Sequence, residues 1–170
     1  MHHQAQPASK LIDVFDIRTE FQVILVGPDG LRIMNLGPNV ITNSGRSNMA
    51  HLFAGHDVAN RSALSIKVGD AGHNPLSPSE PVVANSSDTA LFGSVVITKS
   101  LSFEFPDGEN ANRVTFTATI GTNEANGSGS QAISEVGIFD LAGRMLSHKT
   151  FGLITKTEIF GLQFRYSFLF

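Results

Sequence analysis

The chain has 170 residues, of which 41% are hydrophobic and 16% are charged, and it carries a net charge of −3 with no Cys or Trp. This charge balance excludes the basic surface expected of a nucleic-acid-binding protein, and the lack of Cys excludes disulfide scaffolds and thiolate metal sites. No apolar run approaches the roughly 20 residues that a membrane helix needs, so no membrane contact is predicted.

The N-terminal region divides into an arm and a first hairpin. Residues 1–15 are predicted to form a mobile arm, because the first nine are mostly polar and lack a signal-peptide pattern. The remaining residues, 16–170, are predicted to form a single domain. Within it, apolar runs at 21–26 and 31–36 flank an Asp-Gly pair, which favours a β-hairpin.

A single short helix is predicted at residues 44–54. Met49, Leu52 and Phe53 recur at a helical spacing, and the Thr, Asn and Ser residues just before them are suitable N-caps. Gly55 is placed as a C-terminal stop. The helix is expected to pack on or beside a sheet.

The residues after the helix predict several strands and a long loop. Strands are predicted at 62–68, 94–105, 113–120 and 133–139, and the second and third of these form the clearest hairpin. Lys99 interrupts the apolar face of residues 94–105, which indicates a bulge or an exposed end there. The Gly- and Pro-rich residues 69–81 are predicted to form a loop.

The C-terminal residues have the strongest pattern in the chain. An apolar, mostly aromatic side chain occupies every second position: Phe160, Leu162, Phe164, Tyr166, Phe168 and Phe170. Successive side chains of a strand point to opposite faces, so this pattern predicts a core strand that other strands cover. With about eight to ten strands and one helix, the chain is predicted to be an all-β protein, a β-sandwich or jelly-roll-like domain.

Several stretches of the chain resemble small virion structural proteins of tailed bacteriophages. The resemblance rests on Ile133-Ser-Glu-Val-Gly-Ile-Phe139, on Leu146-Ser-His-Lys-Thr-Phe151 with Ile154-Thr-Lys156, and on the final aromatic strand. Three earlier landmarks are similar to that group as well: Val40-Ile-Thr-Asn-Ser-Gly45, Val68-Gly-Asp70 and Asp88-Thr-Ala-Leu91. The resemblance implies a head decoration or head-fibre protein, a neck or collar component, or a tail-fibre or baseplate attachment piece.

Few polar residues are candidates for chemistry. Glu135 lies among apolar residues of its predicted strand. It is therefore expected either to form a buried ion pair, with Lys149 or Lys156 as partner, or to accept backbone hydrogen bonds. Both of these structural roles are favoured over a role as an acid catalyst. Asp70 and His73 are weak candidates for metal ligands, because no further ligand lies at a suitable spacing. No catalytic residue, metal site or cofactor is predicted.

The resemblance, together with the lack of a recognisable reaction centre, implies a structural, non-catalytic subunit of a phage particle that assembles into a symmetric oligomer. Its expected partners are copies of itself and other virion proteins, and its expected location is the virion after synthesis in the host bacterial cytoplasm. The alternative is a β-sandwich module that binds a host-surface carbohydrate or receptor. The sequence has no Trp and its one Tyr lies in the core pattern, which disfavours a sugar-stacking site.

Overall fold

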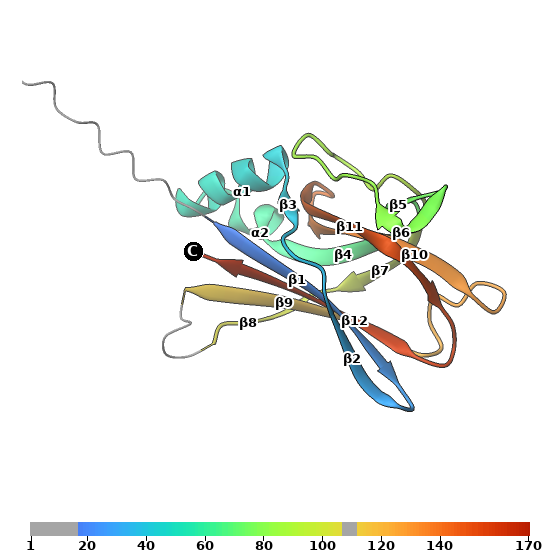
Figure 1. The fold of residues 1–170 in the computed structure, drawn as a ribbon. Helices are drawn as coiled ribbons and strands as arrows, with labels where there is room; N and C mark the ends of the chain where they lie inside the picture. Colours follow the sequence, from blue (N-terminus) through green and yellow to red (C-terminus); the bar gives the residue numbers. More distant parts are fainter. Residues whose placement is uncertain (1–16, 107–111) are drawn as a thin grey trace, which may run out of the picture.

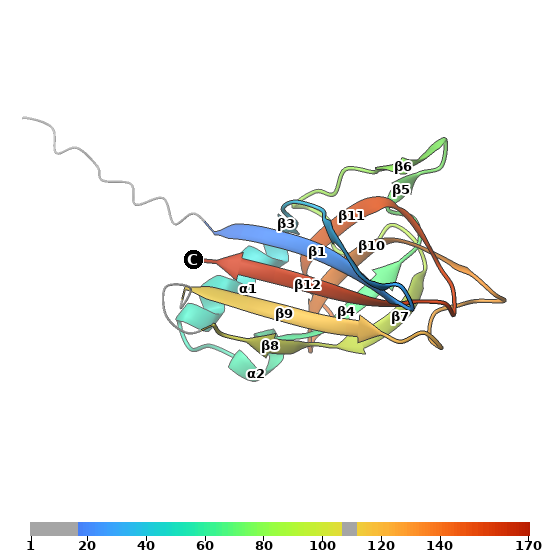
Figure 2. The same ribbon diagram turned by 60° about the horizontal axis from the view of Figure 1, so that its bottom comes forward.

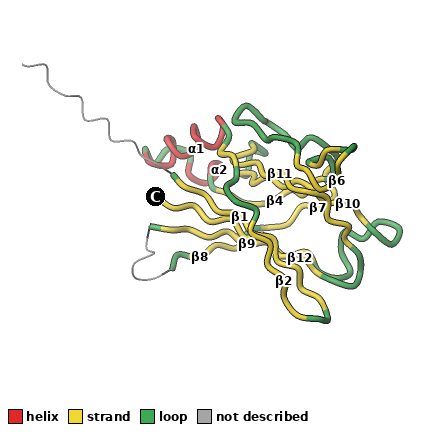
Figure 3. The backbone as a smooth tube through the Cα atoms, in the orientation of Figure 1, coloured by secondary structure: helices red, strands yellow, loops and turns green. Residues whose placement is uncertain are grey.

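A computed structural model describes residues 17–106 and 112–170 of the chain. The arm predicted at residues 1–15 lies outside the described residues, as does most of the turn between the predicted strands at 94–105 and 113–120. The described part consists mainly of strands, which form two antiparallel sheets packed face to face as a β-sandwich (Figures 1 and 3). The predicted all-β class is therefore confirmed.

The first sheet, sheet A, contains both the N-terminal hairpin and the C-terminal strand. In spatial order it consists of β2 (Gly30–Asn35), β1 (Arg18–Gly27), β12 (Gly161–Leu169), β9 (Arg113–Ile120) and β8 (Ser102–Glu104). Figure 2 shows β1, β12, β9 and β8 side by side in this order. The Asp-Gly turn between β1 and β2 forms as predicted, and Gly30 adopts a positive φ of 104° that favours glycine.

The second sheet, sheet B, contains the strands formed by residues 133–139 and 146–156. In spatial order it consists of β3 (Val40–Ile41), β11 (Met145–Lys156), β10 (Gln131–Asp140), β4 (Ala63–Gly69) and β7 (Val95–Ser100). A small separate hairpin, β5 (His73–Asn74) with β6 (Ser77–Pro81), forms within the predicted 69–81 loop. It lies on the side of sheet B that faces away from sheet A (Figures 1 and 2).

Two helices lie at the end of the sandwich where β1 begins and β12 ends (Figure 1). The predicted helix is α1 (Asn43–Phe53), whose N-cap Thr42 accepts a hydrogen bond from the backbone N–H of Gly45 at 3.0 Å. Gly55 follows with a φ of 65°, as expected of a stop. The second helix, α2 (Val58–Arg61), was not predicted, and the preceding residue Asp57 is left-handed with a φ of 53°.

The aromatic C-terminal strand is central, as predicted. β12 pairs with β1 on one side and β9 on the other, and Leu162, Phe164 and Tyr166 are fully buried between the sheets. The Tyr166 hydroxyl donates a hydrogen bond across the core to the Val136 carbonyl at 3.1 Å. Burial in the core raises the pKa of Tyr166 well above its usual value, so the hydroxyl remains protonated.

The ends of the aromatic pattern are less buried than predicted. Phe160 and Phe168 are half-buried against the core, while Phe170 follows the last strand and is 45% exposed. The backbone of Phe170 is nevertheless fixed, because it exchanges two hydrogen bonds with Asn112, at 2.9 and 2.8 Å.

The prediction of one continuous strand over residues 94–105 is wrong. The chain leaves sheet B after β7, and Leu101 donates a backbone hydrogen bond to Leu64 before the chain enters sheet A as β8. Consequently, the predicted apolar face is not one core face: Phe103 and Phe105 remain about two-thirds exposed. The hairpin partner is correct, because β8 pairs with β9.

Candidate functional site

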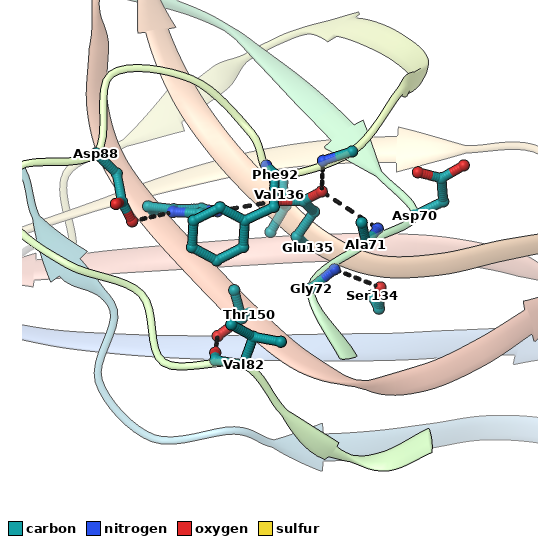
Figure 4. Close-up of polar contacts among 12 residues, drawn as sticks. Asp70, Ala71, Gly72, Val82, Asp88, Phe92, Ser134, Glu135, Val136 and Thr150 are labelled. Carbon is teal, nitrogen blue, oxygen red and sulfur yellow. Dashed lines mark hydrogen bonds and ion pairs between the residues drawn. The ribbon is translucent and has the colours of Figure 1, made fainter. Parts of the chain in front are cut away.

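The most elaborate polar arrangement lies beneath the segment that connects β4 to β7. This segment, residues 70–94, crosses the outer face of sheet B and includes β5 and β6 (Figure 1). Figure 4 shows polar side chains of β10 and β11 that meet this segment. The name polar cluster is used here for three residues, Asp88, Glu135 and His148.

A bulge in β10 explains why Glu135 points away from the core. The pairing of β10 with β11 shifts register between Ile133 and Glu135. As a result Ile133 and Val136 both belong to the core between the sheets, although they are three residues apart. Simple alternation along the strand would place Glu135 on the same face as Ile133, and it fails here because it does not account for the extra residue.

Glu135 accepts four hydrogen bonds while its side chain is fully buried. Its Oε1 accepts from the backbone N–H of Gly93 at 2.8 Å and of Ala71 at 3.3 Å. Its Oε2 accepts from the backbone N–H of Phe92 at 2.8 Å (Figure 4). The same oxygen contacts Nε2 of His148 at 3.1 Å. The carboxylate thus fastens both ends of the 70–94 segment to β10.

His148 lies between two carboxylates. It is fully buried on β11, and its Nδ1 contacts Oδ2 of Asp88 at 2.7 Å while its Nε2 contacts Glu135. The ring of Phe92 covers it edge-on, with the two ring centroids 4.8 Å apart. A neutral imidazole donates only one hydrogen bond, whereas an imidazolium donates two, so this arrangement favours the charged form.

The electrostatics of the cluster agree with its geometry. Burial raises the pKa of Glu135, but hydrogen bonds from His148 and from the backbone N–H groups of Phe92, Gly93 and Ala71 outweigh burial, and its pKa lies below the usual value. Burial lowers the pKa of His148, but the hydrogen bonds and negative charges of Glu135 and Asp88 outweigh it, and its pKa lies above the usual value. Both the geometry and the direction of these shifts favour an imidazolium ion at His148, in contact with two carboxyl groups.

Two further contacts hold the same segment to sheet B. Ser134 Oγ accepts a hydrogen bond from the backbone N–H of Gly72 at 2.9 Å and also contacts the ring of His73. The Thr150 hydroxyl donates to the Val82 carbonyl at 2.6 Å (Figure 4). Every side chain in these contacts comes from β10, β11 or the segment itself, so the contacts fix the segment on the outer face of the sheet.

The backbone of Gly69 packs closely against the side chain of Glu135. A Cβ atom at Gly69 would lie 2.7 Å from Glu135 Oε1, which is too close for any other residue without movement of the carboxylate. Gly137, which lies across from His148 in β11, is similarly crowded, since a Cβ there would lie 2.9 Å from the Met145 sulfur. Only glycine fits at these positions with the observed packing.

The predicted lysine partners of Glu135 are wrong. Lys149 instead donates a hydrogen bond to the Pro38 carbonyl at 2.8 Å. Lys156 is fully buried and donates to the carbonyls of Thr122 and Thr157 and to Oδ1 of Asn126, which fixes the 121–131 loop. Burial lowers the pKa of both lysines.

Asp70 and His73, the weak metal candidates, have separate partners. Asp70 accepts a hydrogen bond from the backbone N–H of Ser94 at 3.0 Å, and His73 contacts Ser134. Among the described residues, no group of three or more His, Cys, Asp or Glu side chains is arranged to hold a metal ion. Within the polar cluster the two carboxylates lie at opposite nitrogens of His148, so they face the ring and not a common point.

An apolar hollow of about 160 Å³ lies elsewhere, between α1 and the adjoining parts of both sheets. Its walls include Met49, Leu52, Val114, Phe116, Phe168 and Phe170. The hollow provides hydrophobic contacts and no acid, base or nucleophile among these side chains. Within the described residues no helix is both long and apolar enough to cross a membrane.

The polar cluster was only partly accessible to sequence reasoning. Glu135 was identified as a buried carboxylate, but His148 was known only as part of a motif and Asp88 only as part of a landmark. Their separation in the chain hides the contact, because Asp88 reaches His148 across 60 residues.

Comparison of the chain with protein-family models, with curated proteins and with solved structures gave no match.

Proposed function

We propose that this chain is a structural, non-catalytic subunit of a bacteriophage particle and that it assembles into a symmetric oligomer. Its partners would be copies of itself and other virion proteins, and its location the virion. The observation that best supports a role in assembly is the exposed apolar surface on the two edge strands of sheet A, β2 and β8. The assignment to a phage rests on the sequence resemblance.

The edge strand β2 exposes apolar side chains that a monomer would leave in water. Leu31 and Ile33 are 70% and 56% exposed, and both lie on the outer face of sheet A next to Val26 and Ile24 of β1. Free edges of natural sheets are usually protected by charges, proline or bulges. β2 carries one charge, Arg32, and no proline, so it is suited to contact with another subunit.

The opposite edge of sheet A has a similar character. Phe103 of β8 and the following Phe105 stack edge-on, with ring centroids 5.8 Å apart, and Phe103 in turn approaches Phe116 at 6.3 Å. Phe103 and Phe105 thus form an exposed apolar surface at this edge of the sandwich. A neighbouring subunit that covers it would gain hydrophobic stabilisation.

The phage-like landmarks take part in internal packing, which supports a structural role. Glu135, His148 and Asp88 form the polar cluster, and Gly69 of another landmark packs against Glu135. Thr42 of the first landmark caps α1 and bonds to β11. These residues have buried side chains or internal partners, which leaves no reacting group at an accessible position among them.

Recognition of a host-surface carbohydrate or receptor is the second candidate function. The exposed Phe103 and Phe105 favour it, because aromatic faces stack on sugar rings, and the sequence alone did not reveal that these two rings are exposed. A glycan array with the purified chain tests this candidate. Specific binding that disappears in Phe103→Ala would favour recognition over assembly.

Sedimentation velocity of the purified chain tests the assembly role. The proposal predicts one discrete species larger than the monomer whose proportion rises with concentration. A monomer at all accessible concentrations would contradict self-assembly, and a continuous distribution of sizes would indicate aggregation through the edges instead of a closed symmetric oligomer.

A further inference from the structure

The segment over the polar cluster has two firm anchors and a short stretch between them. At one end the Ser86 carbonyl accepts a hydrogen bond from the backbone N–H of Asn43 at 2.7 Å. At the other end the backbone N–H of Ser94 donates to Asp70 at 3.0 Å. Residues 87–93, named the latch here, are held between these anchors by the polar cluster.

We propose that His148 makes the latch sensitive to pH: the imidazolium holds Asp88 and Glu135 together, and loss of its proton releases the Asp88 end of the latch. The proposal concerns the fold itself and holds for either candidate function. The conformational change is the opening of the Asp88 end of the latch, while Phe92 and Gly93 stay bonded to Glu135, and the protonation of His148 controls it.

The two ends of the latch differ in the contacts that remain once His148 is neutral. Glu135 retains three backbone N–H donors, from Phe92, Gly93 and Ala71. Asp88 retains one, from the backbone N–H of Asn85 at 2.8 Å, which belongs to the same turn. The Asp88 side chain is also 13% exposed, whereas that of Glu135 is fully buried. Asp88 is therefore the end that water can solvate when its bond to His148 is lost.

Of the charged groups described around His148, the two carboxylates are the ones in direct contact with its ring. On β10, Glu135 contacts Nε2, and on the latch, Asp88 contacts Nδ1. On β4, Lys67 lies beyond Gly137 in the same cross-strand row, and its amine is placed over the ring of Phe139 at 4.3 Å. On β3, the residue paired with His148 is the uncharged Val40.

The nearby ionisable groups of the 70–94 segment have other contacts. Asp70 accepts from Ser94, and His73 contacts Ser134. The balance at His148 is thus one imidazolium against two carboxylates, and burial strengthens each attraction because little water screens it. The raised pKa of His148 places the release of the latch above pH 6.5.

The experiment combines an NMR titration of His148 with hydrogen exchange of the latch. The imidazole shifts should report a protonated ring at pH 6.5, with both nitrogens carrying hydrogen. Protection factors of the latch amides around Asp88, which correct for faster exchange in base, should fall about 10- to 100-fold as the ring titrates, as expected for one hydrogen bond to a charged group. Those of Phe92 and Gly93, which stay bonded to Glu135, should not fall with them. Core amides of β12 should not change with them.

Two variants make the test specific. Asp88→Asn should lower the pKa of His148 and leave the latch already open at pH 6.5, whereas His73→Gln, a matched change of a neighbouring histidine, should preserve the titration step. A neutral His148 at pH 6.5 would overturn the proposal. It would also be overturned by latch protection that stays constant while His148 titrates, or by a step that His73→Gln abolishes and Asp88→Asn does not.

Discussion

Replacement of Glu135 by Gln is the sharpest test of the polar cluster. The two side chains have the same size, so the change removes the charge without opening a cavity. Each oxygen of Glu135 accepts two hydrogen bonds, Oε1 from Gly93 and Ala71, and Oε2 from Phe92 and His148. Whichever way the amide of Gln is oriented, its NH₂ group therefore faces at least one backbone N–H donor, from Gly93 and Ala71 in one orientation and from Phe92 in the other.

The expected loss of stability follows from these contacts. At least one of the four hydrogen bonds to a charged acceptor is lost, at about 1.5–3 kcal/mol, and His148 loses one of its two counterions. Relief of the desolvation of the buried carboxylate offsets part of this cost. We therefore expect the free energy of unfolding to fall by about 3–5 kcal/mol, as found when one partner of a buried pair is removed.

Urea denaturation followed by circular dichroism measures this loss. Glu104→Gln is the matched control, since Glu104 forms an exposed ion pair with Arg165 at 3.4 Å and its loss should cost about 0–1 kcal/mol. If Glu135→Gln cost no more than the control, the interpretation of Glu135 as a buried anion that fastens the 70–94 segment would be refuted.

Three other predictions concern pH, the core and the edge of sheet A. The stability that His148 contributes is fully present below pH 6.5 and is lost as the pH rises through its raised pKa. The stability that Glu135 contributes is present above pH 4.5 and is lost as the pH falls through its lowered pKa. Urea midpoints should therefore decline above and below the range from pH 4.5 to 6.5, and a profile that is flat with pH would contradict the roles given to these two residues. Tyr166→Phe should lower the free energy of unfolding by about 0.5–1.5 kcal/mol, because it removes the hydrogen bond to Val136, and a stabilised variant would show that this bond contributes nothing. Ile33→Lys should abolish self-association seen in sedimentation while leaving the urea midpoint of the monomer nearly unchanged; an intact oligomer would exclude β2 from the interface.

The sequence predicted the elements whose patterns are local. The alternation in β12 is uninterrupted from Leu162 to Tyr166, and these side chains face the core as expected. The β1–β2 hairpin depends on one Asp-Gly turn, and α1 depends on a cap and a stop within a few residues of its ends. Such features depend on steric and hydrogen-bonding preferences of neighbouring residues, which a single sequence contains.

The parts that were mispredicted depend on contacts between distant residues. Residues 94–105 alternate like one strand, yet the chain changes sheets at Leu101, a choice made by tertiary packing. The predicted strand order and the opposite charge favour Lys149 or Lys156 as the partner of Glu135. The bulge in β10 instead turns Glu135 away from the core, where it contacts His148 of β11. Asp88, which is 60 residues from His148 in the chain, contacts the other nitrogen of the same ring.

Native mass spectrometry of the purified chain tests the central claim, assembly into a symmetric oligomer, most directly. The account predicts a single closed stoichiometry, such as a trimer, a hexamer or a dodecamer, that reverts to monomer when Ile33→Lys is introduced. A spectrum that contains only monomer for the unmodified chain would contradict the claim.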